Sequence, residues 1–182
     1  FGLTSRLDAS NADQHYDVIN QALQTPAFLP RALFERFNIE VIATTEGPLD
    51  ELKWHQMIRD SGWKGRVITA YRPDSVVDPD FVGFRGNIRR LSELTGEDSE
   101  SWSGYLASHR KRRAYFKTFG ATSSDHGHPT ALTADLDTAA AQALFARVLS
   151  PHPSAKDKEL FRWHTLITMA ALLCSYGLCM KT

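Results

Sequence analysis

Two cysteines, no net charge and no long apolar run set the first limits on this 182-residue sequence. Cys174 and Cys179 are too few for a disulfide framework and lack CxxC spacing, so they predict a buried, reduced pair in a cytoplasmic protein. Basic and acidic residues both number 21, which gives no overall attraction for nucleic acid or an anionic membrane. The apolar segment Leu166–Met180 is shorter than the ~20 residues that span a bilayer, so we expect a buried helix running into a strand and no membrane insertion.

Glycine-rich phosphate-binding motifs and a signal segment are also missing. No predicted strand is followed by GxGxxG or by a P-loop pattern. The sequence opens FGLTSRLDAS, without a basic region followed by an apolar one and without methionine, and it ends GLCMKT on a predicted strand. We therefore expect this chain to be an internal fragment of a longer protein.

The sequence does contain a regular alternation of strand-like and helix-like segments. β-Branched runs predict strands at 39–45 (IEVIATT) and 66–71 (RVITAY), and shorter strands at 120–124 and 178–181. This order indicates a parallel α/β sheet, either doubly wound or part of a (β/α)8 TIM barrel. We expect one domain over 1–182, with leading helices in 1–37 and successive βα units in 38–182. Helices are predicted at 11–24, 30–37, 49–62, 79–94, 100–118, 136–149 and 156–176.

Polar residues collect after three successive strands, in the stretches TTEG, YRPD and SSDHGH. In parallel α/β folds, the loops at the carboxyl ends of the strands line the active site. Glu46, Arg72 and the Asp125-His126 pair are therefore expected at the rim of one pocket. Arg72 suits a carboxylate or phosphate clamp, with a structural salt bridge to Asp74 as the equal alternative.

The two imidazoles of His126 and His128 allow either acid/base chemistry or metal binding. An HxH pair on an extended strand can bind zinc, but Gly127 and Pro129 indicate that the chain has left the strand, and no third ligand is evident. We favour His126 as an acid/base or substrate-binding residue, because an imidazole titrates near neutral pH. Asp125 either orients His126 or caps the next turn. His128 is interpreted as a loop residue.

Two further features have ordinary structural interpretations. Glu46 either touches a substrate or favours the N-terminus of the following helix through the macrodipole. The run 109–117 (HRKRRAYFK) is interpreted as a solvated helix face with Tyr115 and Phe116 turned inward, and not as a nucleic-acid recognition helix.

At its strand ends the sequence resembles uronate isomerase (glucuronate isomerase), a (β/α)8 barrel family of the amidohydrolase superfamily. Ile42–Pro48 (IATTEGP) is similar to the family's strand 2 pattern VGTTDDP, and Tyr71–Asp74 (YRPD) to WRPD at the end of strand 3. Ser124–His126 matches the SDH that ends strand 4. The likeness extends from FGLTSRL to GLCMK, so this chain would carry about strands 2 to 5 of eight.

The resemblance implies an aldose–ketose isomerase that converts D-glucuronate to D-fructuronate and D-galacturonate to D-tagaturonate through an enediol. It implies that Arg72 grips the sugar acid, with Thr45 and Glu46 as further substrate-binding candidates, and that His126 and Asp125 are the catalytic candidates. It also implies a divalent metal, zinc or manganese, in the full-length enzyme. The HxH that binds it belongs to strand 1 and an Asp to strand 8, so we expect no complete metal site in this chain.

Departures from the family pattern limit what this chain is expected to do alone. TTEGP replaces TTDDP, which puts the role of Glu46 in doubt. The isolated chain is expected to be inactive, and its unpaired strand edges invite association, including into a homo-oligomer. The alternatives are a metal-dependent hydrolase of the same superfamily, or a non-catalytic module whose HRKRRAYFK segment binds an acidic partner.

Overall fold

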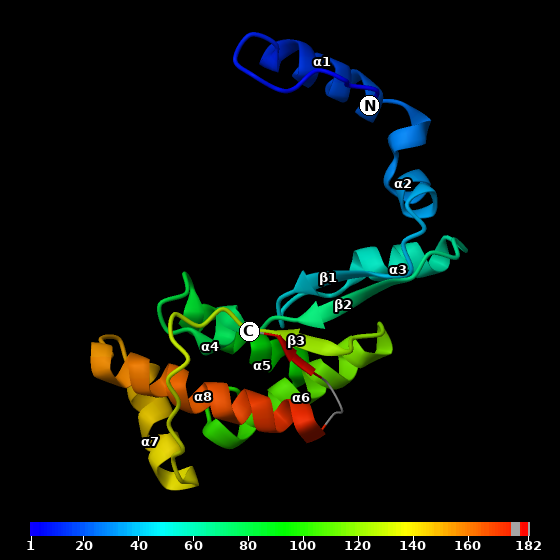
Figure 1. Ribbon diagram of the computed structural model, residues 1–182. Coiled ribbons are helices and arrows are strands. Elements are labelled where there is room, and N and C mark those ends of the chain that lie inside the picture. Colours follow the sequence, from blue (N-terminus) through cyan, green and yellow to red (C-terminus); the bar gives the residue numbers. More distant parts are fainter. Residues whose placement is uncertain (176–178, 182) are drawn as a thin grey trace. The chain divides into compact units, whose positions relative to one another are not determined.

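The computed structural model describes residues 1–175 and 179–181, which divide into two compact units. One unit comprises Phe1–Ile42 with Trp63–Arg66, and the other comprises Ala43–Gly62 with Val67–Thr182. The expectation of one domain over 1–182 stays a prediction. The elements in chain order are α1 (Ala12–Leu23), η1 (Pro26–Phe28), α2 (Pro30–Arg36), β1 (Ile42–Glu46), α3 (Lys53–Asp60), β2 (Val67–Tyr71), α4 (Asp74–Val77), α5 (Phe84–Thr95), α6 (Trp102–Thr118), β3 (Ser123–Asp125), α7 (Thr138–Val148), α8 (Ala155–Ser175) and β4 (Cys179–Lys181) (Figure 1).

The smaller unit is held together by aromatic contacts around its short helices. Phe34 of α2 packs edge-on against Trp63, with 4.9 Å between ring centroids. The Trp63 indole N–H donates to Glu35 over 3.2 Å, and the Arg31 guanidinium lies 5.2 Å from the centre of the Trp63 ring. A return segment of the chain therefore ties down α2 through one tryptophan.

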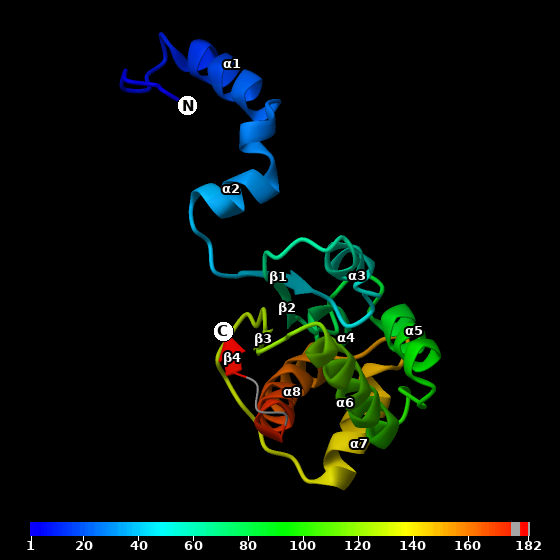
Figure 2. The same cartoon turned by 90° about the vertical axis from the view of Figure 1, so that its right-hand side faces the viewer.

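The larger unit is built on a sheet with strand order β1-β2-β3-β4. β2 and β3 run parallel with Tyr71 opposite Ser124, and β3 and β4 run parallel with Asp125 opposite Lys181. The α3 and α6 helices pack against β2, and α8 packs against β4; Figure 2 shows these helices together beside the strands. The predicted α/β fold with a parallel sheet is confirmed.

Most of the apolar core lies between helices. Trp102 and Tyr105 of α6 stack on each other with 5.5 Å between ring centroids, and Phe145 of α7 and Phe161 of α8 close the cluster. A second cluster joins the sheet to α6, where Tyr71 meets the ring of Phe116 at 5.0 Å. Burying each large ring contributes about 2–3 kcal/mol to the stability of the fold. The packing of Tyr71 against Phe116 therefore holds the carboxyl end of β2 against α6.

Two expectations from the sequence concern the C-terminal segment. Cys174 is exposed, so the prediction that it is buried is wrong: the last turn of α8 buries Leu172 and Leu173 and leaves the next residue facing solvent. The side chain of Cys179 lies outside the described part of the structure. Among the described residues, no helix is both long and apolar enough to cross a membrane.

Candidate active site at the strand ends

Arg72 and Asp125 meet at the carboxyl ends of β2 and β3. The parallel register sets Tyr71 opposite Ser124, so the next residue of each chain segment, Arg72 and Asp125, also lie side by side. Arg72 Nη1 is 3.3 Å from Asp125 Oδ2, and Arg72 Nε donates to Asp74 Oδ2 over 2.6 Å. The hydrogen bond to Asp74 raises the pKa of Arg72, and the charge of Asp125 raises it further. With 46% of its side chain exposed, the guanidinium is held by two carboxylates and remains open to a ligand.

Asp74 connects the loops that follow both strands. It begins α4, and its second oxygen, Oδ1, accepts the Gly127 N–H over 3.0 Å. Gly127 permits this approach because a Cβ there would lie 2.7 Å from Asp74 Oδ2 and 2.8 Å from Arg72 Nη2. From the sequence, Asp74 was predicted as a salt-bridge partner of Arg72 and as the last residue of the YRPD motif, and Gly127 as the point where the chain leaves the strand. Their positions inside YRPD and between two histidines were the signals that could have identified them.

His126 is 5% exposed and is held by Ser124, not by Asp125 as expected. The Ser124 hydroxyl donates to the Tyr71 carbonyl over 2.7 Å, so it accepts from His126 Nε2 over 2.8 Å. His126 Nε2 therefore carries the proton and Nδ1 is a hydrogen-bond acceptor. This Nδ1 is buried and has no hydrogen-bond partner among the described residues.

The surroundings of His126 determine its charge. Burial, followed by the charges of Arg113 and His128, lowers the pKa of His126 to about 3. The ring is thus uncharged at neutral pH, and it lines a cavity of about 170 Å³ together with His128, Thr130, Ala131 and Leu166. These properties suit a neutral hydrogen-bond acceptor better than a proton carrier.

His128 lies against His126 and is half-buried. The two rings stack at 5.8 Å between centroids with an interplanar angle of 14°, and burial is the main cause that lowers the pKa of His128. A closed zinc site needs four ligands and a catalytic one at least three from the protein. No cluster of three or more His, Cys, Asp or Glu side chains that could hold a metal occurs in the described residues.

Glu46 lies in a polar network on one face of β1. It accepts the hydroxyl of Thr69, and its Oε1 is 3.8 Å from His55 Nε2. The following helix, α3, begins only at Lys53, so the macrodipole interpretation of Glu46 is wrong. Thr45 lies on the opposite, exposed face of the strand. Because side chains alternate along β1, Thr45 and Glu46 point to opposite faces of the strand, and Glu46 faces β2 and α3.

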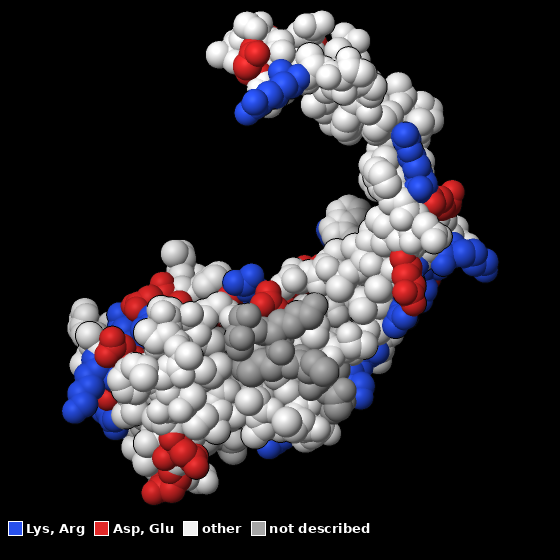
Figure 3. Space-filling model, in the orientation of Figure 1, with Lys and Arg blue, Asp and Glu red and all other residues white. Residues whose placement is uncertain are grey.

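The basic run 109–117 is only in part the solvated helix face that was expected: Arg110, Lys111 and Lys117 are exposed and Phe116 is buried, as predicted, but three other members of the run turn inward. His109 and Arg113 are fully buried and Arg112 is 8% exposed. Arg112 donates to the Pro48 and Asp50 carbonyls at 2.7 and 2.6 Å, which satisfies its charge by contacts distant in sequence. On the face drawn in Figure 3, acidic and basic side chains are interspersed.

Two buried residues of this run, His109 and Arg113, pack against Tyr71, the last residue of β2. The Tyr71 hydroxyl bonds His109 Nδ1 over 2.8 Å, and the Arg113 guanidinium lies 4.6 Å from the centre of the Tyr71 ring. Burial raises the pKa of Tyr71 to about 12, and burial together with Arg113 holds the pKa of His109 well below its usual value. His109 was missed because its partner is distant in sequence, although a tyrosine before Arg72 requires a polar partner once buried.

Comparisons with known proteins support one family. The family model described as glucuronate isomerase matches residues 1–182. Uronate isomerases from Mesorhizobium japonicum and Phenylobacterium zucineum are 61% and 58% identical over 181 residues, covering the whole chain but only 39% and 38% of those proteins. The chain thus spans about two fifths of the length of these relatives.

Solved structures show the same relationship. The crystal structure of glucuronate isomerase from Caulobacter crescentus matches 99% of this chain and 38% of its own with a TM-score of 0.91 and 52% identity. A uronate isomerase from Thermotoga maritima, 19% identical, covers 97% of this chain and 39% of its own with a TM-score of 0.85, which shows the shared fold. Because the family model covers every residue, this chain belongs to the glucuronate isomerase family.

Proposed function

We propose that the protein containing this chain is a uronate isomerase, an aldose–ketose isomerase that interconverts D-glucuronate with D-fructuronate and D-galacturonate with D-tagaturonate. Its strands would form about strands 2 to 5 of a (β/α)8 barrel in a cytoplasmic enzyme of the amidohydrolase superfamily. The observation that carries this proposal is the Arg72, Asp74 and Asp125 cluster at parallel strand ends, in a chain whose whole length matches the family.

Arg72 would bind the carboxylate of the sugar acid or a hydroxyl beside it. Its guanidinium is half exposed, while Asp74 and Asp125 fix its orientation before a ligand arrives. A planar guanidinium can donate two parallel hydrogen bonds to a carboxylate, which gives orientation as well as affinity. Pre-organisation of this kind lowers the entropy cost of binding.

His126 and Asp125 would contact the part of the sugar that reacts. The reaction moves a proton from C2 to C1 through an enediol, so it needs a proton acceptor and donors that stabilise the developing oxyanion. His126 Nδ1, an uncharged acceptor, would receive a hydrogen bond from a substrate hydroxyl. The Asp125 carboxylate is partly exposed beside Arg72 and would be the group that takes or returns a proton.

The remaining candidates have smaller roles in this proposal. Thr45 is exposed and would contact substrate from the end of β1, whereas Glu46 would orient that strand end through Thr69. The family implies a divalent metal, zinc or manganese, that supplies electrophilic stabilisation of the oxyanion when bound. The described residues hold no three-ligand cluster that fits it, so its ligands would come from other parts of the full-length protein.

The test is an isomerase assay on a protein of the relatives' full length that contains this chain, called the parent-length protein. D-Glucuronate and added zinc or manganese are supplied to the wild type, Arg72→Met and His126→Asn. We expect each change to lower kcat/KM by about 100-fold or more, because each removes a hydrogen bond that orients substrate. Arg147→Met is the matched control, since Arg147 is 52% exposed and pairs with Asp157 over 2.9 Å on another surface. An inactive wild type, or activity indifferent to both site changes, contradicts the proposal.

A further inference from the structure

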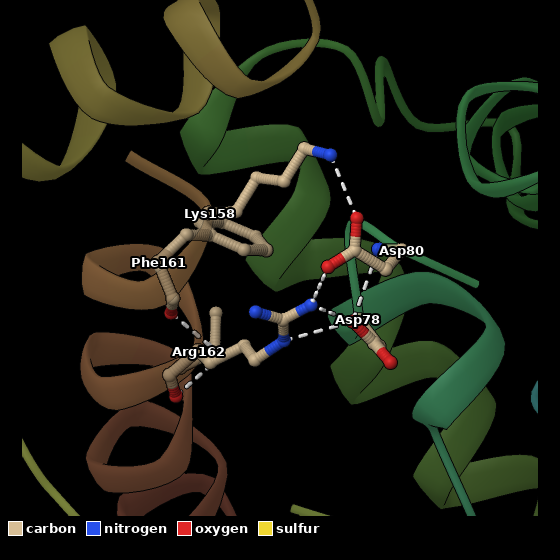
Figure 4. Close-up of polar contacts among 6 residues, drawn as sticks. Asp78, Asp80, Lys158, Phe161 and Arg162 are labelled. Carbon is tan, nitrogen blue, oxygen red and sulfur yellow. Dashed lines mark hydrogen bonds and ion pairs between the residues drawn. The ribbon is translucent and has the colours of Figure 1, made fainter. Parts of the chain in front are cut away.

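A cluster of ion pairs joins the loop after α4 to the first half of α8 (Figure 4). Arg162 Nε and Nη2 reach Asp78 Oδ1 at 2.9 and 2.7 Å, and Nη2 also bonds Asp80. Lys158 donates to the other oxygen of Asp80 over 2.7 Å. In Figure 4, Arg162 extends from α8 across to Asp78, and Lys158 reaches Asp80 above it.

The cluster has a covered part and an exposed part. Only 11% of the Arg162 side chain is exposed, against 31% for Asp78 and 54% for Asp80. Exposed pairs such as Lys158–Asp80 hold geometry weakly, because water screens them and both side chains lose freedom. The mostly covered Arg162 guanidinium brings two nitrogens to one oxygen of Asp78, and charge-assisted hydrogen bonds of this kind are held more firmly. Arg162 and Asp78 are therefore the pair that fixes this loop.

Asp78 is one helical turn from the candidate active site. It directly follows α4, and its N–H donates to the Asp74 carbonyl over 2.9 Å. Asp74 in turn accepts Arg72 Nε and the Gly127 N–H. A shift of Asp78 would therefore move the carboxylate that connects Arg72 to the loop after β3.

We propose that Arg162 is a positioning residue: by anchoring Asp78 it sets Asp74, and through Asp74 the Arg72 guanidinium and Gly127, in the geometry that grips a sugar acid. Arg162 does not touch the reacting atoms. The proposal rests on the proposed function only for its kinetic consequence, because the anchoring itself is a structural property of this chain.

The kinetic test compares Arg162→Met with Lys158→Met in the parent-length protein. Both remove a cation from the same helix face, but only Arg162→Met removes the ion pair with Asp78, whose Oδ1 then keeps, among the described residues, only the Asp80 N–H at 3.0 Å. We expect Arg162→Met to raise KM for D-glucuronate about 10-fold or more with a smaller change in kcat, because the Arg72 contact is made in substrate and transition state alike. Lys158→Met should stay within about twofold, and Arg162→Lys should recover part of the loss because it keeps the charge without the planar fork. Equal effects of Arg162→Met and Lys158→Met overturn the proposal.

A second measurement does not depend on the reaction. Hydrogen–deuterium exchange is followed by mass spectrometry for the peptide that contains Gly127 and for a control peptide around Phe116. We expect faster exchange at Gly127 in Arg162→Met than in the wild type, with no change in Lys158→Met or at the buried control peptide. Unchanged exchange at Gly127 overturns the anchoring. If the wild type has no isomerase activity but Gly127 responds to Arg162→Met, the proposed function fails and the positioning role stands.

Discussion

Replacing Gly127 by alanine should damage the candidate site through one added methyl group. The ideal Cβ would lie 2.7 Å from Asp74 Oδ2 and 2.8 Å from Arg72 Nη2. Ordinary non-bonded contacts to carbon are about 3.5 Å, so these two groups must withdraw by roughly 0.7 Å. A displacement near 1 Å at an orienting group costs about 100-fold in rate, which is about 2.7 kcal/mol of transition-state stabilisation. Gly127 does not have a positive φ, so backbone strain adds nothing to this effect.

The matched control for this substitution is Gly86→Ala on α5. A Cβ at Gly86 meets no atom within 4 Å, and alanine is more favourable than glycine in a helix by about 0.5–1 kcal/mol. Steady-state isomerase kinetics and urea denaturation of the parent-length protein are compared for both variants. We expect Gly127→Ala to lose about 100-fold in kcat/KM and Gly86→Ala to keep it. A Gly127→Ala variant whose kcat/KM stays within threefold of the wild type would show that the added methyl group does not displace Arg72 and Asp74.

Two further predictions follow from charge and from the extent of the chain. The pKa of His126 is about 3 in the folded protein and about 6.5 in the unfolded chain, so the unfolded chain binds a proton at a higher pH. The contribution of the neutral His126 to the free energy of unfolding is therefore present above pH 6.5 and is lost as the pH falls toward 3. Between pH 7 and pH 5 the free energy of unfolding should fall by about 2 kcal/mol from this group. Urea denaturation should show a smaller fall in His126→Gln than in the wild type. An equal pH dependence of stability in the wild type and the variant would contradict this prediction. The isolated 182-residue chain, with added zinc or manganese, should not isomerise D-glucuronate, since it spans only about two fifths of the length of its uronate isomerase relatives. Turnover by the isolated chain would show that this expectation is wrong.

The fold was predictable from the sequence where one local signal dominated. The runs IEVIATT and RVITAY predicted strands because β-branched side chains favour extended backbone, and β1 and β2 lie within or beside these segments. The alternation of strand-like and helix-like segments then predicted a parallel sheet, which the register of β2 and β3 confirms. The short helix α4 was missed because its one turn carries no periodic pattern.

The site was only partly predictable, because its contacts join residues distant in sequence. The motifs YRPD and SSDHGH identified Arg72 and Asp125, which lie 3.3 Å apart. The predicted partner of His126, Asp125, was wrong. Because side chains alternate along the strand, Asp125 points toward Arg72, and Ser124 lies on the side of the His126 imidazole and hydrogen-bonds it. The burial of Arg112 could not be predicted from the sequence, because the backbone carbonyls that accept its hydrogen bonds belong to Pro48 and Asp50, in a loop before α3.

We expect Arg72 and His126 to contact the same bound sugar acid. The most direct measurement is a crystal structure of the parent-length protein with bound D-glucuronate. We expect a sugar carboxylate or an adjacent hydroxyl within about 3.2 Å of the Arg72 guanidinium, and a sugar hydroxyl donating to His126 Nδ1. A uronate bound at a site that touches neither residue would show that Arg72 and His126 do not form the sugar-acid site.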